Sequence, residues 1–175
     1  MTEHHPVEPV KLVVAALCSS PEALEKSLAG LRNCRGELDY QGSAHPFNLT
    51  DYYQEEMGEA LERTLVSFQR PTSPGELVNL KHECVKLEKA LADEPGHRTA
   101  NLDAGYLDHG KFVLASLKPA GQKIYLAHGV YADLVARYSG GQYRPFEWTF
   151  PDFTSGVYDE DLAMIRQRYL EQLRS

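Results

Sequence analysis

Lys11-Leu12-Val13-Val14-Ala15-Ala16-Leu17 is the stretch around which the rest of this chain must be built, because residues 12–17 are an unbroken apolar run. A short run without polar alternation is typical of a β-strand that is covered on both faces. It is far shorter than the roughly 20 residues that a membrane-spanning helix needs. We therefore expect residues 11–17 to form a central strand of a sheet.

Two helices are expected after this strand, each with the same kind of start signal. Ser19-Ser20-Pro21-Glu22 offers a serine cap, a proline in the first turn and an acid that can reach back, and Ser73-Pro74-Gly75-Glu76 repeats the pattern. Apolar residues three and four apart then give each segment one buried stripe. The stripes are Leu24, Leu28 and Leu31 in the first helix and Leu77, Leu80, Cys84, Leu87 and Leu91 in the second, which Pro95-Gly96 ends. We expect both helices on one face of the sheet.

The remaining pattern predicts an α+β fold with an antiparallel sheet. Strands expected at residues 37–40, 61–68 and 99–103 complete a βαββαβ order, which indicates a ferredoxin-like core. Additional C-terminal antiparallel strands are expected at residues 111–118, 123–126, 130–138 and 143–150, with Ser139-Gly140-Gly141-Gln142 as a hairpin turn. An amphipathic helix at residues 159–174 closes the chain. We expect residues 1–9 to be a disordered tail and residues 10–175 to be a single α+β domain.

The composition of the chain argues against some classes of partner and some cellular locations. The formal net charge is −7 and the pI is about 5.5, which argues against duplex nucleic acid, because a phosphate-tracking surface needs clustered Lys and Arg. Residues 1–9 are acidic and rich in His and Pro, unlike a secretory signal. Cys18, Cys34 and Cys84 are widely spaced and form no Cys-x-x-Cys pair. We therefore expect packed thiols in a cytoplasmic protein that does not enter membranes.

An aromatic and acidic pattern occurs at three places. These are residues 47–53 (Phe-Asn-Leu-Thr-Asp-Tyr-Tyr), 101–106 (Asn-Leu-Asp-Ala-Gly-Tyr) and 148–153 (Trp-Thr-Phe-Pro-Asp-Phe). Asp, Asn, Gly and Pro favour turns, so we expect all three motifs on connections. Flat rings beside carboxylates suit a sugar, a base or a peptide, and they suit lids over a small core equally well. Buried aspartates need partners, and we consider Lys81, Lys118, Lys123, Arg137 and Arg144.

Two segments resemble known motifs but lack residues that those motifs require. Residues 105–111 (Gly-Tyr-Leu-Asp-His-Gly-Lys) have the spacing of a phosphate-binding loop, but Phe112 stands where Ser or Thr should hold magnesium. The residues that follow favour a strand over the required helix, so we expect no P-loop. His97-Arg98-Thr99 is similar to half of the two-histidine phosphoesterase signature, but the sequence has no second half. We therefore interpret His97 as a solvated residue.

Oxygen and imidazole ligands near the expected connections would suit magnesium or manganese if several of them converge. They are Asp51, Glu55, Glu56, Asp103, Asp108, His109, His128 and Asp152. Their spacing does not require a metal. We therefore assign no metal ligands and leave the cofactor open.

Several of these residues belong to an ordered set that extends over nearly the whole chain. The set comprises Asp51-Tyr52-Tyr53, Glu56-Met57-Gly58, Asn101-x-Asp103-x-Gly105-Tyr106, Ile124-Tyr125-Leu126, Gly129-Val130-Tyr131-Ala132-Asp133 and Trp148-Thr149-Phe150-Pro151-Asp152-Phe153. In this set the chain resembles the uncharacterised prokaryotic domain-of-unknown-function family 4416. The resemblance implies no established activity, although some members of the family are named GTP-binding protein.

The resemblance also directs attention to particular residues. The last motif of the family usually has Tyr where this chain has Phe150 and Phe153, so hydroxyls at these positions are poor candidates for chemistry. Asp133 and Ala104 also differ from the usual Glu and Pro. The better ligand-binding candidates are Asp51, Tyr52, Glu56, Asp103, Tyr106, Trp148 and Asp152.

Two hypotheses about function follow. In the first, the protein binds a nucleotide or a phosphorylated metabolite, as an enzyme or a binding protein, where the three motifs meet at a sheet edge. In the second, it docks another protein through an exposed sheet edge or an aromatic patch. A single concavity lined by Asp51, Asp103 and Asp152 would favour the first. On that hypothesis, Asp103→Asn and Asp152→Asn should leave the melting temperature unchanged or raised.

Overall fold

The computed structural model describes residues 2–175 as nine β-strands and five α-helices. The strands are β1 (Lys11–Cys18), β2 (Leu38–Gln41), β3 (His45–Pro46), β4 (Glu62–Phe68), β5 (Ala100–Leu107), β6 (Lys111–Ser116), β7 (Lys123–Ala127), β8 (Val130–Ser139) and β9 (Gln142–Pro145). The helices are α1 (Pro21–Arg35), α2 (Gln54–Met57), α3 (Glu76–Leu91), α4 (Pro151–Thr154) and α5 (Asp159–Arg174). None of the helices in residues 2–175 is long and apolar enough to cross a membrane.

All nine strands form one antiparallel sheet with the order β2-β4-β1-β5-β6-β8-β7. In addition, β3 pairs with β4 and β9 pairs with β8. β1 lies between β4 and β5, and all eight of its residues are buried. The mixed α and β composition and the central position of the apolar strand are therefore confirmed.

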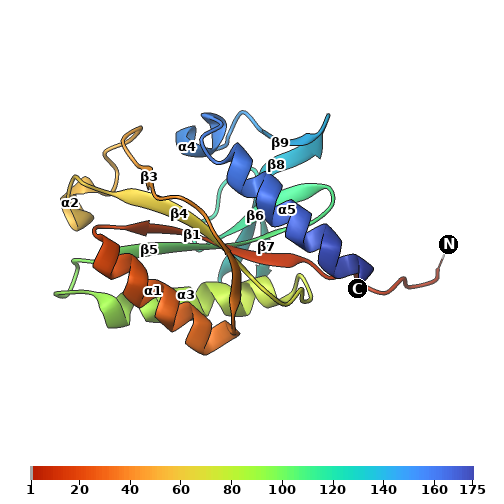
Figure 1. The fold of residues 1–175 in the computed structure, drawn as a ribbon, viewed down its shortest axis with the longest axis horizontal. Coiled ribbons are helices and arrows are strands. Elements are labelled where there is room, and N and C mark those ends of the chain that lie inside the picture. Colours follow the sequence, from red (N-terminus) through yellow and green to blue (C-terminus); the bar gives the residue numbers. More distant parts are fainter. Residues whose placement is uncertain (1) are drawn as a thin grey trace.

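Two helices cover one face of the sheet and one helix covers the other (Figure 1). α1 and α3 pack together on one side, where Leu28 and Leu80 lie in one cluster with Val14 of β1. α5 crosses the opposite side, where Ile165 lies in a second cluster with Val13. We call these the α1/α3 face and the α5 face. The structure confirms that the two helices after the start signals share a face, and that the closing helix is present.

The two helix-start signals act differently. Ser20 caps α1, because its Oγ accepts the backbone N–H of Ala23 at 3.1 Å. Ser73 accepts the N–H of Gly75 at 3.3 Å, and α3 then begins without a side-chain cap. α3 also ends at Leu91, so Pro95-Gly96 lies in the turn that follows the helix.

Two expectations about the motifs are wrong. Residues 101–106 are not a connection, because β5 includes all of them and pairs with β1 along its whole length. Pairing with a buried central strand outweighs the local turn preference of Asn101, Asp103 and Gly105. β9 ends at Pro145, so residues 146–150 are a connection and not the end of a strand.

Residues 146–150 complete the sheet without being a strand. β7 and β9 pair with the same edge of β8, but neither pairs with Leu134 or Val135. Trp148 Nε1 donates to the carbonyl of Leu134 at 2.7 Å, and Thr149 Oγ1 donates to that of Val135 at 2.6 Å. At these two residues of β8, side-chain hydrogen bonds therefore take the place of pairing with a strand.

β1 carries one buried charge, at its first residue. Lys11 Nζ donates to Asp39, and it donates to Gln172 Oε1 at 2.7 Å. Burial lowers the pKa of Lys11, although the Asp39 carboxylate opposes this effect. The N-terminal strand therefore depends on a side chain of the closing helix α5.

A substitution at Gly105 would test how closely β5 and β6 approach each other. A Cβ at this position would lie 2.5 Å from the carbonyl oxygen of Val113 and 2.8 Å from Leu114 Cδ2. Because the carbonyl belongs to the sheet, we expect Gly105→Ala to lower the free energy of unfolding by about 2 kcal/mol in urea denaturation. Gly110→Ala is the control, since the nearest atom to its Cβ would lie 3.9 Å away. Equal stability of the two variants would contradict this close approach.

Candidate functional site

All three motifs meet at a buried arginine on the α5 face. Arg63 of β4 is only 3% exposed, and its Nη1 donates to Asp152 Oδ2 at 2.8 Å. Its Nη2 donates to Asp103 Oδ2 of β5 at 3.1 Å, across the intervening strand β1. Phe47 and Phe153 lie over the guanidinium, with ring centroids 5.0 and 5.7 Å from its Cζ. We call Arg63, Asp103 and Asp152 the Arg63 centre.

The Arg63 centre has unbalanced charge and an unused donor. One guanidinium faces two carboxylates. Although burial favours loss of its proton, Asp103 and Asp152 hold the pKa of Arg63 above its ordinary value, so it remains charged. Tyr158 Oη also donates to Asp152, at 3.0 Å. Arg63 Nε, in contrast, is one of the few buried side-chain atoms in residues 2–175 without a hydrogen-bond partner. A buried donor without a partner is uncommon in native structures and needs an explanation.

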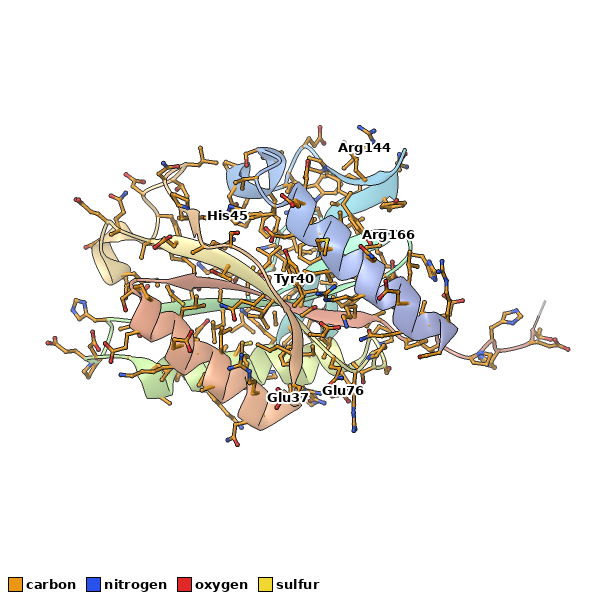
Figure 2. The ribbon with its side chains drawn as sticks, in the orientation of Figure 1. Glu37, Tyr40, His45, Glu76, Arg144 and Arg166 are labelled. Carbon is orange, nitrogen blue, oxygen red and sulfur yellow. The ribbon has the colours of Figure 1, made fainter. Side chains whose placement is uncertain are left out.

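A histidine adjoins this centre. His45 of β3 lies opposite Arg63 in the β3–β4 ladder, and its Nε2 lies 2.8 Å from Asp161 Oδ2 of α5. Tyr40 donates to the other Asp161 oxygen at 2.6 Å, and burial together with this contact raises the pKa of Tyr40. Figure 2 shows His45 and Tyr40 on one flank of α5. The ring of Tyr158 contacts that of His45 edge-on at 5.4 Å. A histidine held by a buried aspartate suits proton transfer.

The first motif covers the sheet beside the Arg63 centre. Phe47, Tyr53 and Met57 pack with Leu17 and Leu61 in a small cluster on the α5 face. Burial and the nearby charge of Asp103 raise the pKa of Tyr53 to about 12. We call residues 47–57 the cover segment.

Two polar contacts fasten the cover segment. Arg98 donates to both carboxylate oxygens of Glu56, at 2.7 and 2.9 Å, and these hydrogen bonds lower the pKa of Glu56. Lys118, in the connection between β6 and β7, donates to Tyr52 Oη at 3.0 Å. The cover segment therefore extends from the start of β5 to the far side of β6.

A polar strip leads from Asp103 toward β7. The β5–β6 ladder stops two residues short of Asp103, and the same register would place Asp103 opposite Ser116. Lys123 Nζ donates to Ser116 Oγ at 3.0 Å. Within residues 2–175, neither Lys118 nor Lys123 has a carboxylate oxygen within 4.0 Å. The strip thus has an acidic end at Asp103 and a basic end at the two lysines.

Asp133 is the least satisfied group of this strip. It lies opposite Lys123 in the β7–β8 ladder, is 9% exposed, and has no described hydrogen-bond partner for its Oδ1 within residues 2–175. Burial raises the pKa of Asp133, although Lys123 and Gln122 oppose this. Since a buried, under-satisfied carboxylate costs stability, it is typical of a position retained for function.

The structure brings four of the seven candidate residues into this region. Asp103 and Asp152 belong to the Arg63 centre, and Tyr52 and Glu56 hold the cover segment. Tyr106 packs on the α1/α3 face, because neighbouring residues of a strand alternate between faces.

The other two candidates also lie apart from the Arg63 centre. Trp148 bonds to the backbone of β8, and Asp51 is exposed and makes no side-chain hydrogen bond within residues 2–175. Asp51 therefore makes no contact with the Arg63 centre through a side-chain hydrogen bond. The three loops expected from the sequence are one connection, one strand, and one connection that continues into α4.

Sequence reasoning missed Arg63, His45 and Asp161. The cations considered as partners for the aspartates are not their partners, because Arg63 takes that role. The available signal was Arg63 itself, a charged residue on the same face of its strand as Leu65 and therefore in need of burial with counter-charges. No feature of the neighbouring sequence indicates that His45 and Asp161 form a pair, because they are 116 residues apart.

The other sequence segments have plain structural roles. Residues 105–111 end β5 and connect it to β6, where Lys111 pairs with Asp108 at 2.6 Å. His97 is exposed after α3. In residues 2–175 no group of three or more His, Cys, Asp or Glu is arranged to hold a metal ion.

Comparison with known proteins gives one match. The family described as Domain of unknown function (DUF4416) matches residues 8–169, which include all nine strands and the Arg63 centre. The chain belongs to this family. No curated protein and no solved structure matches it. The family resemblance in the sequence is thus confirmed.

Replacement of Asp152 tests the electrostatics of the Arg63 centre. We expect Asp152→Asn to lower the free energy of unfolding by about 3 kcal/mol, because a buried guanidinium then keeps only one charged partner. The effect of Asp103→Asn should be smaller, since Asp103 is partly exposed. From the sequence we expected both variants to leave the melting temperature unchanged or raised; the buried contacts of Arg63 lead us to expect a loss of stability instead. Asp51→Asn is the control in urea denaturation, with a change of about 0.5 kcal/mol or less; equal effects of Asp152→Asn and Asp51→Asn would show that the ion pair does not stabilise the fold.

Replacement of Asp133 should have the opposite sign at neutral pH. Burial raises its folded pKa above the ordinary 3.8, so the folded state is penalised once the carboxylate ionises, and the penalty disappears as the pH falls below the unfolded pKa. Asp133→Asn should therefore raise the melting temperature at about pH 7 and lose that advantage near pH 3.5. Thermal unfolding across this range checks it, with Asp51→Asn as the exposed control. A variant that is less stable than the parent at pH 7 would overturn the assignment of Asp133 as an unsatisfied charge.

Proposed function

We propose that this DUF4416 protein binds a small phosphorylated molecule, a nucleotide or a phosphorylated metabolite, on the α5 face between Asp103 and the two lysines. The observation that carries the proposal is the convergence of all three motifs on Arg63, whose Nε keeps an unused N–H, beside a polar strip that ends at Lys118 and Lys123. A network that served stability alone would gain from satisfying that donor.

The charges of the strip match the parts of such a ligand. Asp103, whose side chain is 22% exposed, is suited to accept hydrogen bonds from sugar hydroxyls. Lys118 and Lys123 are suited to hold a phosphate, because each is bonded only to a neutral hydroxyl. Tyr52 and Tyr53, which meet edge-to-face at 4.9 Å, offer ring surface for a flat base.

The histidine beside Arg63 supports an enzymatic form of the same proposal. If Asp161 accepts the Nε2 proton of His45, the other ring nitrogen is left as a base. His45 is one-fifth exposed, so a water molecule or a ligand hydroxyl can reach it. We therefore propose His45 as the group that would take a proton from bound ligand or water.

We also propose that the fold is ferredoxin-like and that the protein is cytoplasmic. The order β2-β4-β1-β5, with α1 and α3 on one face, supports a ferredoxin-like arrangement of the first four long strands. The free thiols of Cys18, Cys34 and Cys84 support a reducing compartment such as the cytoplasm.

An interaction module is the second candidate, and one observation favours it. β7 ends the order of the sheet, and Ile124, Tyr125 and Leu126 on it are 71, 58 and 41% exposed. An exposed apolar edge strand is a template for pairing with another chain. This surface lies beyond the basic end of the strip, so the two candidate functions use different residues.

A ligand panel tests the first proposal. We expect at least one of AMP, GMP, CMP, UMP, ribose 5-phosphate and glucose 6-phosphate to raise the melting temperature and to bind in calorimetry. Asp103→Asn and the double variant Lys118→Gln, Lys123→Gln should each weaken that binding at least about tenfold, equivalent to 1.4 kcal/mol. Lys111→Ala, which removes the lysine of the P-loop-like segment, should leave it within a few-fold.

Two results would count against ligand binding. One is that no member of the panel binds to the parent protein, and the other is that Asp103→Asn binds as tightly as Lys111→Ala. Ile124→Glu addresses the second candidate separately, because it should leave the ligand affinity unchanged while preventing any association through β7.

A further inference from the structure

A hollow of about 370 Å³ lies between α5 and the β8–β9 hairpin. Tyr138 and Tyr143 line it from the hairpin, and Leu162, Arg166 and Leu170 line it from α5. Figure 2 shows Arg166 on the flank of α5 opposite to His45 and Tyr40, so the hollow is separate from the Arg63 centre. Its volume lies within the range of small-molecule sites.

Arg166 is held rigidly at the wall of this hollow. Its guanidinium stacks on Tyr138, with Cζ 3.4 Å from the ring centroid. Its Nη1 donates to the carbonyl of His109 at 2.7 Å and contacts Tyr143 Oη at 2.9 Å. Within residues 2–175, neither Nε nor Nη2 of Arg166 has a hydrogen-bond partner, and no carboxylate oxygen lies within 4.0 Å. A fixed guanidinium with two unused donors is prepared for a planar carboxylate.

The remaining charges of the hollow determine which kind of carboxylate fits. Arg166 and Arg174 line it together with Asp159 and Glu171, so its formal charges cancel. A phosphate would bring two negative charges beside two carboxylates, which is unfavourable. A molecule with one carboxylate and one ammonium has the same balance as the hollow. Leu162 and Leu170 add apolar surface for the rest of that molecule.

We propose that this hollow binds a zwitterionic α-amino acid with a large apolar side chain. Its carboxylate bonds to Nε and Nη2 of Arg166, and its ammonium faces Glu171, which Gln167 contacts at 3.2 Å. Its side chain lies on Leu162, Leu170 and Tyr138. The site is independent of the proposed phosphate ligand, since it shares no residue with the Arg63 centre or the polar strip.

Calorimetric titration of the whole protein with three probes tests this. We expect L-phenylalanine to bind saturably, 3-phenylpropanoate to bind more weakly because it lacks the ammonium, and phenethylamine to bind weakest because it lacks the carboxylate. Arg166→Gln should weaken L-phenylalanine and 3-phenylpropanoate at least about tenfold. Glu171→Gln should weaken L-phenylalanine but leave 3-phenylpropanoate unchanged.

Matched variants keep the test independent of folding and of the other site. Ala163→Trp fills the hollow from an exposed position of α5 without removing a contact, so it should also abolish binding. Arg144→Gln on β9 and Asp103→Asn in the Arg63 centre should leave the affinity for L-phenylalanine unchanged. The proposal is overturned if L-phenylalanine does not bind to the parent protein, or if it binds to Ala163→Trp or to folded Arg166→Gln as tightly as to Arg144→Gln.

Discussion

The two-sided burial of β1 is the constraint on which the rest of the DUF4416 fold depends. A strand of eight residues without an exposed side chain has to be covered twice, and removing that surface from water is the main source of stability. α1 and α3 supply one cover, and α5 supplies the other. The second cover comes from the far end of the chain, so the α5 face is the place where distant residues meet.

The α5 face is apolar beneath the helix and polar beyond it. Arg63 extends the buried face of β4 past Leu65, where Phe47 and Phe153 lie over it, and a buried guanidinium is tolerated only among counter-charges. Asp103 comes from 40 residues away and Asp152 from 89. Arg63 therefore brings together the acidic groups of two motifs, of which Asp152 is buried and Asp103 is partly exposed.

The sequence was informative where a pattern has a local physical cause. The apolar run of β1, the Ser20 cap and the stripe of α5 each follow from the properties of neighbouring residues, and all were predicted. Residues 101–106 gave conflicting local signals, a strand at residues 99–103 and a loop from the turn preference of Asn, Asp and Gly, whereas pairing with β1 determines their conformation. The contacts between Arg63 and its two aspartates join distant residues, so they could be recognised only in the folded structure. Asp51 and Asp152 have the same sequence context, an aspartate beside aromatic residues, but burial separates their roles.

The contact between Lys11 and Gln172 has a consequence for synthesis of the chain. The two residues are 161 positions apart, which corresponds to about 10 to 30 s of translation at 5–20 residues per second. During that interval β1, β4 and β5 have left the ribosome, but their α5 face has no cover and the ammonium of Lys11 lacks its last partner. The nascent chain therefore exposes an apolar sheet surface until α5 emerges. Such transiently exposed apolar surface is prone to aggregation until α5 covers it.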